Sequence, residues 1–328
     1  MRTVVITRPG GPEVLEVVDR PVPTPQPGEV LVRVRAAGLN RADLLQRRGG
    51  YPAPHGAPPD VPGLEFAGEV VQVPDAPGAW RSGDRVFGIA AGGAQAEFLS
   101  IHGGLLASVP ASMSWTDAAA VPEAFMTAFD ALVTQAELRA EERLLVNAVG
   151  SGVGLAAVQL ARVIGATAYG TSRTAGKLDA AREWGMTDGL TLADGPAPLA
   201  DWARTATRGR GMSVVLELVG GSYVPASLDT LGEHGRLLLV GLVAGGRADI
   251  DLGAMLRRRL TIRGTVLRSR SIAEKIAVTR AFSMQVVPML ADGRVRPVVD
   301  SVFPMAEIRS AHERLESDET FGKVVLEI

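Results

Sequence analysis

The sequence predicts an α/β protein of two domains, a mostly β domain followed by a doubly wound parallel sheet. Its 328 residues are enough for about two domains of roughly 150 residues each. Prolines crowd the first 62 residues, where they favour short strands and turns over long helices. From residue 143 onward, apolar runs of strand length alternate with helical stretches, which is typical of parallel strands joined by helices.

The first domain is predicted from short alternating runs. Residues 29–35, 68–73 and 84–88 resemble half-buried strands, because apolar and polar side chains alternate along them. Residues 116–132 have a helical composition, and Pro122 is expected to begin a second helix there, since proline suits the first helical turn. These elements predict a compact, mostly β domain.

The second domain is predicted from alternating strands and helices, which imply a parallel sheet covered on both faces. The expected strands are 144–148, 167–171, 214–219 and 236–242, and the expected helices are 153–164 and 176–184. The strand between Leu260 and Val266 is expected to be the last of this sheet.

The C-terminal part returns to a different pattern. Residues 273–292 predict one long helix, and residues 323–328 predict a terminal strand that returns to the first domain. The expected domains are therefore residues 1–124 with 273–328, and residues 125–272.

Composition excludes several classes of site. The net charge is −2, so no overall field draws the chain to nucleic acid or to an anionic membrane. The chain has no cysteine, which excludes thiolate catalysis and cysteine-containing zinc sites, and its four histidines are far apart. Residues 144–161 carry no charge, but three glycines interrupt them, so they predict a strand, a turn and a helix rather than a membrane span. We expect a cytoplasmic protein.

The most informative motif is the glycine-rich turn that contains Gly150, Ser151, Gly152, Val153 and Gly154. It follows a predicted strand and precedes a predicted helix, and in this context a glycine cluster indicates a dinucleotide-binding turn. Glycine lets a pyrophosphate approach the backbone amides, and the helix N-terminus supplies unpaired N–H groups with a partial positive charge. The turn predicts a dinucleotide site, although Val149 and Ser151 stand where the usual pattern has glycines. A tight strand–helix junction without a ligand is the alternative.

The end of the next predicted strand indicates which dinucleotide binds. An NAD site usually has an acidic residue there, which binds the ribose hydroxyls. This chain instead has Ser172, Arg173 and Lys177, which are donors suited to a 2′-phosphate. We therefore expect NADPH as the cofactor; the alternative is a solvated basic loop.

Several segments, spread over most of the chain, have to be taken together. They are residues 39–47, 62–65, 122–124, 127–129, 151–154, 220–223, 267–270 and 322–326. Together they resemble the zinc-independent NADPH:quinone oxidoreductase family of the medium-chain dehydrogenases/reductases. The resemblance implies a GroES-like, mostly β catalytic domain, a Rossmann cofactor domain and a cleft between them.

The resemblance also implies site residues. Asn40 and Tyr51 are expected near the nicotinamide as the catalytic pair, and no metal is expected. Asp43, Glu65 and Glu217 are expected to be structural. The expected cofactor contacts are Thr127, Gly150, Ser151, Gly152, Val153, Ser172, Arg173, Lys177, Gly241, Leu242, Leu267, Arg268 and Lys323.

Two positions depart from the patterns of related enzymes. Leu192 stands where the family often has a tyrosine near the 2′-phosphate, so one phosphate contact is missing unless Arg173 replaces it. Zinc-dependent relatives have a cysteine near the position of Asn40 and a Gly-His-Glu segment where this chain has Gly63-Leu64-Glu65. The resemblance therefore argues against zinc.

Hydride transfer to a simple ketone creates an alkoxide that needs a metal or a strong proton donor. A quinone or a conjugated enone spreads the charge, so positioning and a modest donor are enough. The expected reaction is reduction of a small-molecule quinone, with Tyr51 as the donor; a packing role for Tyr51 is the alternative. Reduction of enones, alkenals or enoyl thioesters, and an NADPH-binding or RNA-binding crystallin-like protein with little turnover, remain open.

Residues 257–270 contain six arginines, which could form a nucleic-acid patch. They contain no aromatic residue to stack on bases, so a solvated helix end followed by a strand is the favoured interpretation, and no nucleic-acid partner is expected. In the family, the strand that corresponds to Leu260–Val266 pairs with its copy across a two-fold axis. The resemblance therefore implies a homodimer through this strand.

Overall fold

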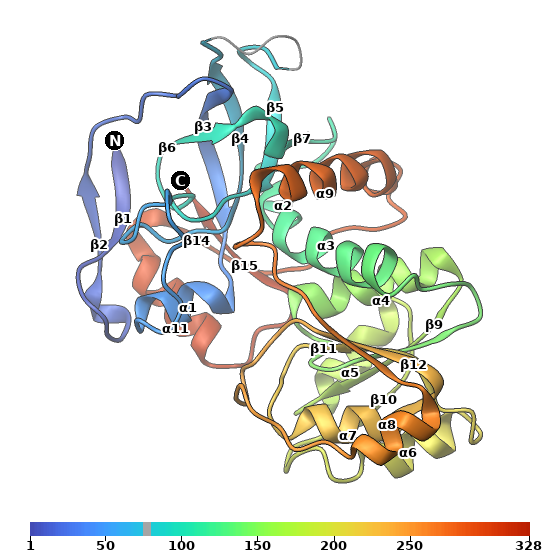
Figure 1. Cartoon of the computed structure of the whole chain (residues 1–328). Helices are drawn as coiled ribbons and strands as arrows, with labels where there is room; N and C mark the ends of the chain where they lie inside the picture. The colour runs from blue at the N-terminus through green and yellow to red at the C-terminus, as the bar shows by residue number, and fades with distance from the viewer. Residues whose placement is uncertain (75–79) are drawn as a thin grey trace. The chain divides into compact units, whose positions relative to one another are not determined.

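The computed structural model describes residues 1–74 and 80–328, and it divides into two compact units (Figure 1). The first unit comprises Met1–Met126 and Leu267–Ile328, and the second comprises Thr127–Val266. The sequence-based boundary at residue 273 differs from this division, because residues 267–272 belong to the first unit. Arg268 explains the difference, since its guanidinium binds Gln46 and the Ala91 carbonyl, both in the first unit.

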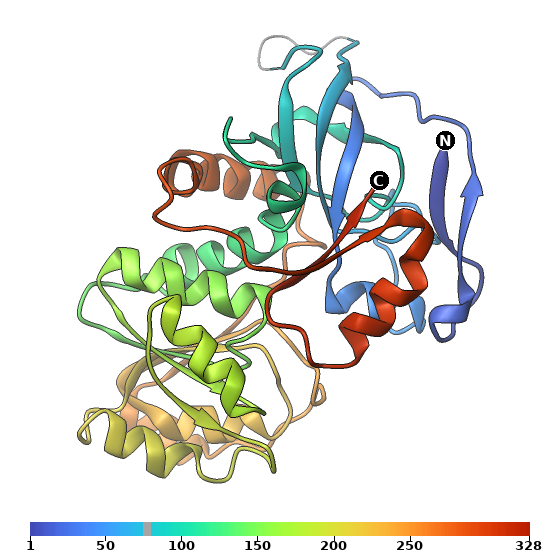
Figure 2. The ribbon, with the colours of Figure 1, turned by 180° about the vertical axis from the view of Figure 1, so that it is seen from behind.

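The first unit is built around one mixed sheet with the strand order β14–β15–β3–β4–β5–β7, and β6 also pairs with β3. The terminal strand β15 lies antiparallel to β3, so the predicted return of the chain end to the first domain is confirmed (Figures 1 and 2). A separate hairpin joins β1 to β2. The strands are β1 Arg2–Ile6, β2 Leu15–Asp19, β3 Glu29–Gly38, β4 Glu65–Gln72, β5 Arg85–Ile89, β6 Phe98–His102, β7 Leu106–Ser108, β14 Val299–Pro304 and β15 Lys323–Glu327.

The helices of the first unit differ from prediction at one place. The expected long helix over 273–292 is wrong, because the chain forms α9 (Ile272–Gln285) and a separate α10 (Val287–Ala291). Pro288 explains the break, since it lacks an N–H and its ring would clash with the carbonyl of the preceding turn. The second helix expected at Pro122 is confirmed as α3. The remaining helices are α1 Arg41–Arg47, α2 Trp115–Ala119, α3 Pro122–Phe129, which crosses the boundary between the units, and α11 Ile308–Glu316.

Two apolar clusters hold the first unit together. One lies between the strands and α9, where Phe282 packs edge-on against Phe87 with 5.9 Å between ring centroids. The other joins the chain's two ends, since Val4 and Leu15 pack with Leu326 and with Leu315 of α11. Burial of these side chains stabilises the unit by on the order of 1.5–3 kcal/mol each. The unit is therefore discontinuous in sequence, but its two segments share one apolar core.

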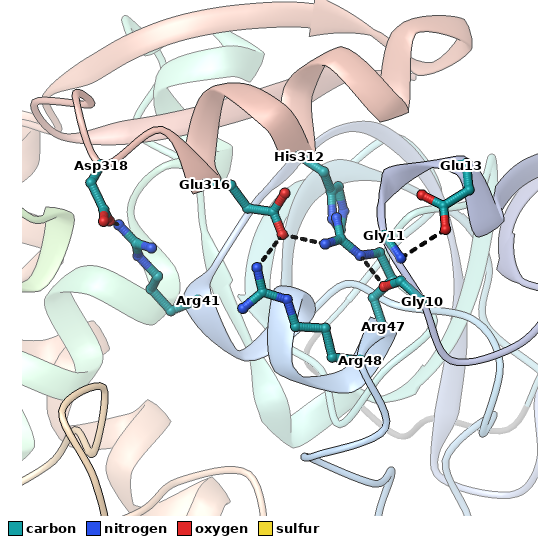
Figure 3. A network of polar contacts seen from close by, with 9 residues as sticks. All are labelled: Gly10, Gly11, Glu13, Arg41, Arg47, Arg48, His312, Glu316 and Asp318. Atoms are coloured by element: carbon teal, nitrogen blue, oxygen red, sulfur yellow. Dashed lines mark hydrogen bonds and ion pairs between the residues drawn. The ribbon is translucent and has the colours of Figure 1, made fainter.

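A polar network also ties α1 to α11 (Figure 3). The Arg47 guanidinium is buried; it donates to the Gly10 carbonyl at 3.1 Å, lies 3.2 Å from Nδ1 of His312 and pairs with Glu316. Arg48 pairs with the same Glu316 oxygen at 2.6 Å, but its side chain is exposed. Burial and the Arg47 charge lower the pKa of His312 to about 3, so this imidazole stays neutral beside the guanidinium.

The second unit contains a wholly parallel sheet with the strand order β10–β9–β8–β11–β12–β13. This order confirms the predicted doubly wound sheet. Helices α4 and α5 lie on one face, and α6, α7 and α8 gather on the other (Figures 1 and 2). The strands are β8 Arg143–Val146, β9 Thr167–Ser172, β10 Met186–Thr191, β11 Met212–Glu217, β12 Leu231–Leu239 and β13 Thr261–Gly264. The helices are α4 Gly152–Ile164, α5 Ala175–Glu183, α6 Leu199–Ala206, α7 Tyr223–Thr230 and α8 Leu252–Arg258, and a π-helical segment, Asp130–Gln135, follows α3.

Within residues 1–74 and 80–328, none of the helices combines the length and the apolar character needed to cross a bilayer.

We predict that Arg47→Met lowers the free energy of unfolding by about 3 kcal/mol, because it leaves the Gly10 carbonyl and one side of Glu316 without a buried partner. The matched control is Arg48→Met, which removes the exposed partner of the same carboxylate and should cost at most about 1 kcal/mol. Urea unfolding of both variants measures the difference. Equal losses would contradict the role given to the buried arginine.

Candidate active site

The glycine-rich turn lies between β8 and α4, and its backbone is as tight as the sequence suggests. Ser151 is the N-cap of α4, because its hydroxyl accepts the Gly154 N–H at 3.1 Å and donates to the Ala148 carbonyl at 2.8 Å. A Cβ on Gly154 would lie 2.6 Å from the Val149 carbonyl oxygen and 2.8 Å from that of Ala148. Glycine is therefore required where α4 passes over the turn.

The position of this turn suits a phosphate. It follows β8, whose neighbours are β9 and β11, so it lies where the strand order of the sheet reverses. Gly152 and Val153 are the first two residues of α4, and amides in the first turn have no acceptor within their own helix. Their N–H groups and the positive end of the helix dipole can hold a pyrophosphate.

A buried carboxylate fixes the loops around this turn. Glu217 accepts from the amide of Asn147 at 2.5 Å and from the hydroxyl of Ser227 at 2.7 Å. Its other oxygen accepts the backbone N–H groups of Val219 and Gly220 at 2.7 and 3.0 Å. Four donors compensate the buried charge, so the structural role expected for Glu217 fits this geometry.

The end of β9 presents the predicted basic residues. Ser172 is buried and its hydroxyl accepts the Thr174 N–H at 3.3 Å, Arg173 is exposed and Lys177 is half-buried. Leu192 points into the apolar core beneath the sheet, so it makes no polar contribution here. Of the predicted donors for a 2′-phosphate, Ser172 is the last residue of β9, Arg173 follows it and Lys177 lies in the first turn of α5.

Three other predicted cofactor contacts lie in this unit. A Cβ on Gly241 would lie 2.2 Å from the Leu218 carbonyl oxygen, so this residue allows two loops to meet. Leu242 beside it is 54% exposed. Thr127 is buried, and among the described residues its hydroxyl has no hydrogen-bond partner. A buried hydroxyl without a protein partner is a group that a bound cofactor could satisfy.

In the first unit, Lys323 is the centre of a polar cluster. Its side chain is 6% exposed, and its ammonium donates to the Leu39 carbonyl at 2.6 Å, to Oδ1 of Asn40 at 2.6 Å and to Oε1 of Glu65 at 2.5 Å. An ammonium has three donors, and these contacts use all of them. Lys323 thus positions Asn40 and Glu65, and its predicted cofactor contact stays a prediction.

Glu65 also accepts hydrogen bonds from residues at the N-terminal ends of α1 and α3. The Asn40 amide donates to it at 2.9 Å, and the Glu123 backbone N–H donates to its second oxygen at 2.8 Å. Burial, together with the charge of Glu65, raises the pKa of the Glu123 carboxyl to about 7, and the Lys323 charge opposes the shift. The cluster therefore contains a carboxyl group that exchanges a proton near neutral pH.

Asp43 lies in the same cluster as a buried cap of α1. It accepts the backbone N–H of Asn40 at 2.8 Å and that of Gly63 at 3.0 Å, so the structural role expected for it fits. Burial raises its pKa to about 6, although both hydrogen bonds act in the opposite direction.

Tyr51 is held by Arg268. The guanidinium carbon lies 4.8 Å from the centre of the Tyr51 ring, and one nitrogen donates to the Tyr51 carbonyl at 3.4 Å. The other nitrogens donate to the Ala91 carbonyl at 2.8 Å and to the Gln46 side chain at 2.6 Å. Burial raises the pKa of Tyr51, and the Arg268 charge partly opposes this, so the phenol keeps its proton at neutral pH.

The structure thus sorts the predicted site residues into two groups. One group surrounds the glycine turn and the ends of β9 and β12 in the second unit; Gly150 lies in that turn. The other contains Asn40, Tyr51, Arg268 and Lys323 in the first unit, with Leu267 buried beside Arg268. Among the described residues, no hydrogen bond joins Asn40 to Tyr51.

The sequence analysis did not identify Glu123 as a member of the polar cluster around Lys323. It stands in the first turn of α3, directly after Pro122, where acidic residues are common in any helix. The signal that distinguishes it is the neighbouring carboxylate of Glu65, which lies 58 residues earlier in the chain. Only the fold brings the two together.

Comparison with known proteins agrees with both units. A family profile described as "Alcohol dehydrogenase GroES-like domain" matches residues 26–126, and one described as "Zinc-binding dehydrogenase" matches residues 152–282. A quinone oxidoreductase of Lama guanicoe is 30% identical over 99% of this chain and 97% of that protein. The chain belongs to the quinone oxidoreductase family of the medium-chain dehydrogenases/reductases. The predicted family and the predicted GroES-like and Rossmann folds are confirmed.

Two further relatives are informative. The structure of Escherichia coli quinone oxidoreductase in complex with NADPH matches with a TM-score of 0.89 and 29% identity, and it covers 100% of both chains. A mycocerosic acid synthase-like polyketide synthase of Mycolicibacterium smegmatis is 31% identical over 99% of this chain. This chain spans only 15% of the length of that synthase.

Within the part of the chain that the structure describes, no group of three or more His, Cys, Asp or Glu side chains is arranged to hold a metal ion.

We predict that Gly154→Ala destabilises the second unit by about 1–3 kcal/mol and weakens dinucleotide binding, because the added methyl meets two backbone carbonyls. Gly176→Ala is the matched control. Gly176 also lies in the first turn of a helix, a Cβ there meets nothing within 4 Å, and alanine should stabilise the helix by roughly 0.5–1 kcal/mol. Thermal unfolding and calorimetric titration with NADPH measure both effects, and an unchanged Gly154→Ala variant would contradict the prediction.

Proposed function

We propose that this protein is an NADPH-dependent reductase of quinones that transfers hydride from nicotinamide C4 without a metal. One observation carries the proposal: a glycine turn capped by Ser151 lies at the reversal point of the parallel sheet, and the neighbouring strand end offers Arg173 and Lys177 instead of an acid. The NADPH complex of the Escherichia coli relative supports the choice of cofactor.

The chain's residues would bind the cofactor in two ways. The amides of Gly152 and Val153 would hold the pyrophosphate, and Arg173 with Lys177 would bind the 2′-phosphate by charge-assisted hydrogen bonds. Thr127, Gly241 and Leu242 are proposed contacts nearer the nicotinamide. Bound NADPH supplies a hydride, so the protein's own task is to orient the acceptor and to control the proton.

Proton control is proposed for Tyr51. Hydride addition to a quinone leaves a negative charge that the conjugated ring spreads, so a phenol donor is sufficient. Arg268 orients the Tyr51 ring and fixes its backbone. Lys323 holds Asn40 and Glu65 together, and its ammonium thereby occupies the oxygen ligands that a metal would need.

A second candidate activity is reduction of enoyl thioesters. The polyketide synthase relative of Mycolicibacterium smegmatis favours it, since this chain aligns with a segment of that protein over nearly its whole length. An enone, an alkenal and an enoyl thioester share a conjugated carbonyl, so hydride transfer to each would leave an enolate that Tyr51 would protonate. A third candidate is an NADPH-binding protein with little turnover. That function would need none of the buried carboxyl groups around Lys323.

We further propose a homodimer through β13. Within the described residues, β13 lies at the end of its sheet and pairs with β12. Exposed apolar side chains occur nearby on the same unit, at Val266 and at Leu252 and Leu256 of α8. An unpaired edge strand is an aggregation hazard that pairing with a second copy removes. Sedimentation velocity distinguishes a dimer from a monomer.

We predict NADPH oxidation with small quinones and with enoyl thioesters, and steady-state rates with both acceptor classes decide between the first two candidates. A kcat/KM that favours quinones supports the first proposal, and one that favours enoyl thioesters supports the second. NADPH binding without oxidation by any acceptor would favour the protein without turnover.

Arg173→Ala and Lys177→Ala should each raise the KM for NADPH by ~10-fold or more, because each removes a charge-assisted donor worth ~1.5–3 kcal/mol. The KM for NADH should change little, since NADH lacks the phosphate. Measuring both constants for each variant gives the internal control. Equal effects on the two cofactors would show that the phosphate binds elsewhere.

A further inference from the structure

Residues 51–59 form a loop that contains neither a helix nor a strand, and Tyr51 is its first residue. Four of its nine residues are prolines, which have no N–H to donate. Within the loop, all of which the structure describes, the one backbone hydrogen bond joins the Ala57 N–H to the Pro54 carbonyl at 3.1 Å. The position of the loop therefore depends on contacts with side chains outside it.

Gln46 and Arg268 bind the two ends of this loop, and they also bind each other. The Arg268 guanidinium donates to the Tyr51 carbonyl at 3.4 Å, and the Gln46 amide donates to the Pro59 carbonyl at 3.3 Å. Oε1 of Gln46 accepts from Arg268 at 2.6 Å. Both side chains are buried. Three hydrogen bonds thus connect the first residue of the loop to the last.

The end of α1 also brings Tyr51 close to Gln46. Gly49 has a φ of +80°, and its N–H donates to the Gln46 carbonyl at 2.9 Å. The Gly50 N–H donates to the Leu45 carbonyl at 2.8 Å. This pair of bonds is the Schellman arrangement, which ends a helix at a residue of positive φ, a conformation that glycine adopts readily. Tyr51 follows directly, so the backbone places it beside the last turn of α1.

Gln46 helps to fix the plane of the guanidinium over the Tyr51 ring. The guanidinium carbon lies 4.8 Å from the centre of that ring, where a cation is attracted to the aromatic face. Nη2 of Arg268 is bound by Gln46, and Nε is bound by the Ala91 carbonyl at 2.8 Å. Removing the Gln46 oxygen would therefore leave the plane of the guanidinium less restricted.

We propose that Gln46 is a positioning residue for the reduction, an inference that rests on the proposed reductase function. Through Arg268 it fixes the ring of Tyr51, and through Pro59 it fixes the loop that carries this ring. The phenol is then held in one orientation when hydride transfer leaves a negative charge on the acceptor. The proton passes from the Tyr51 oxygen to the acceptor, and water restores it. A donor misplaced by about 1 Å can lose on the order of 10²-fold in rate.

Two substitutions of Gln46 separate its two hydrogen bonds. Gln46→Met removes both at nearly constant side-chain size, and it should lower kcat with a small quinone by ~10-fold. The KM for NADPH should stay within ~2-fold, because the proposed phosphate contacts lie in the second unit. Gln46→Glu keeps an oxygen for Arg268 and loses the donor to Pro59, so it should retain kcat within ~3-fold. Equal losses in the two variants would contradict positioning through Arg268.

Gln95→Met is the matched control. Gln95 is also a buried glutamine of the first unit, but within residues 1–74 and 80–328 its side-chain amide has no hydrogen-bond partner. Its replacement should leave kcat within ~2-fold of the wild type. A ~10-fold loss here as well would show that any buried glutamine of this unit has the same effect, and it would overturn the inference.

The double variant separates positioning from a structural role. In the Tyr51→Phe background, Gln46→Met should change kcat by less than ~2-fold, because the hydroxyl that Gln46 positions is already absent. A merely structural role would give the same ~10-fold loss in both backgrounds.

Fluorine NMR tests the positioning without turnover. The chain has three tyrosines, so fluorotyrosine-labelled protein should give three resonances, of which Tyr51→Phe identifies one. Gln46→Met should shift this resonance and leave those of Tyr169 and Tyr223 in place, and Gln46→Glu should largely restore it. A Tyr51 resonance that does not respond to Gln46→Met would overturn the inference while the reductase function stands. A wild type that oxidises NADPH with none of the acceptors would overturn the function and the inference together, even if the resonance shifts.

Discussion

The hydrogen bonds of the Lys323 ammonium are the interaction on which the first unit depends. They join β15, at the end of the chain, to the turn before α1 and to β4. Burial of either charge alone would be costly, and the Lys323–Glu65 ion pair compensates both charges. The discontinuous unit brings the two residues together.

The constraint on the second unit is a different one: its backbone segments approach each other closely. Gly154 and Gly241 each stand where a single methyl group would meet a carbonyl oxygen. The close contact at Gly154 keeps α4 near β8, so the first backbone amides of α4 lie at the end of β8. The Asn147–Glu217 pair then fixes the loop that follows β11. Binding chemistry in this unit comes from backbone geometry, whereas in the first unit it comes from buried charge.

The sequence predicted those features that depend on local pattern. The strand predicted at 29–35 from alternation lies within β3, and the apolar run predicted as a strand at 144–148 overlaps β8. The glycine turn and the start of α3 follow from the glycines and from Pro122. The long helix over 273–292 failed because the helical composition outweighed Pro288 in the interpretation. The expected contact of Lys323 with the cofactor stays a prediction, whereas its three contacts within the first unit were not foreseen. No pattern in sequence reveals that a lysine near the end of the chain meets a glutamate 258 positions earlier.

The central proposal is that a dinucleotide with a 2′-phosphate binds at the glycine turn of the second unit. Crystals of the protein soaked with NADPH test it most directly. We expect electron density for the pyrophosphate at the amides of Gly152 and Val153 and for the 2′-phosphate beside Arg173 and Lys177. Density that places the adenosine phosphate away from both basic residues, or side chains that fill the space over the glycine turn, would contradict the account.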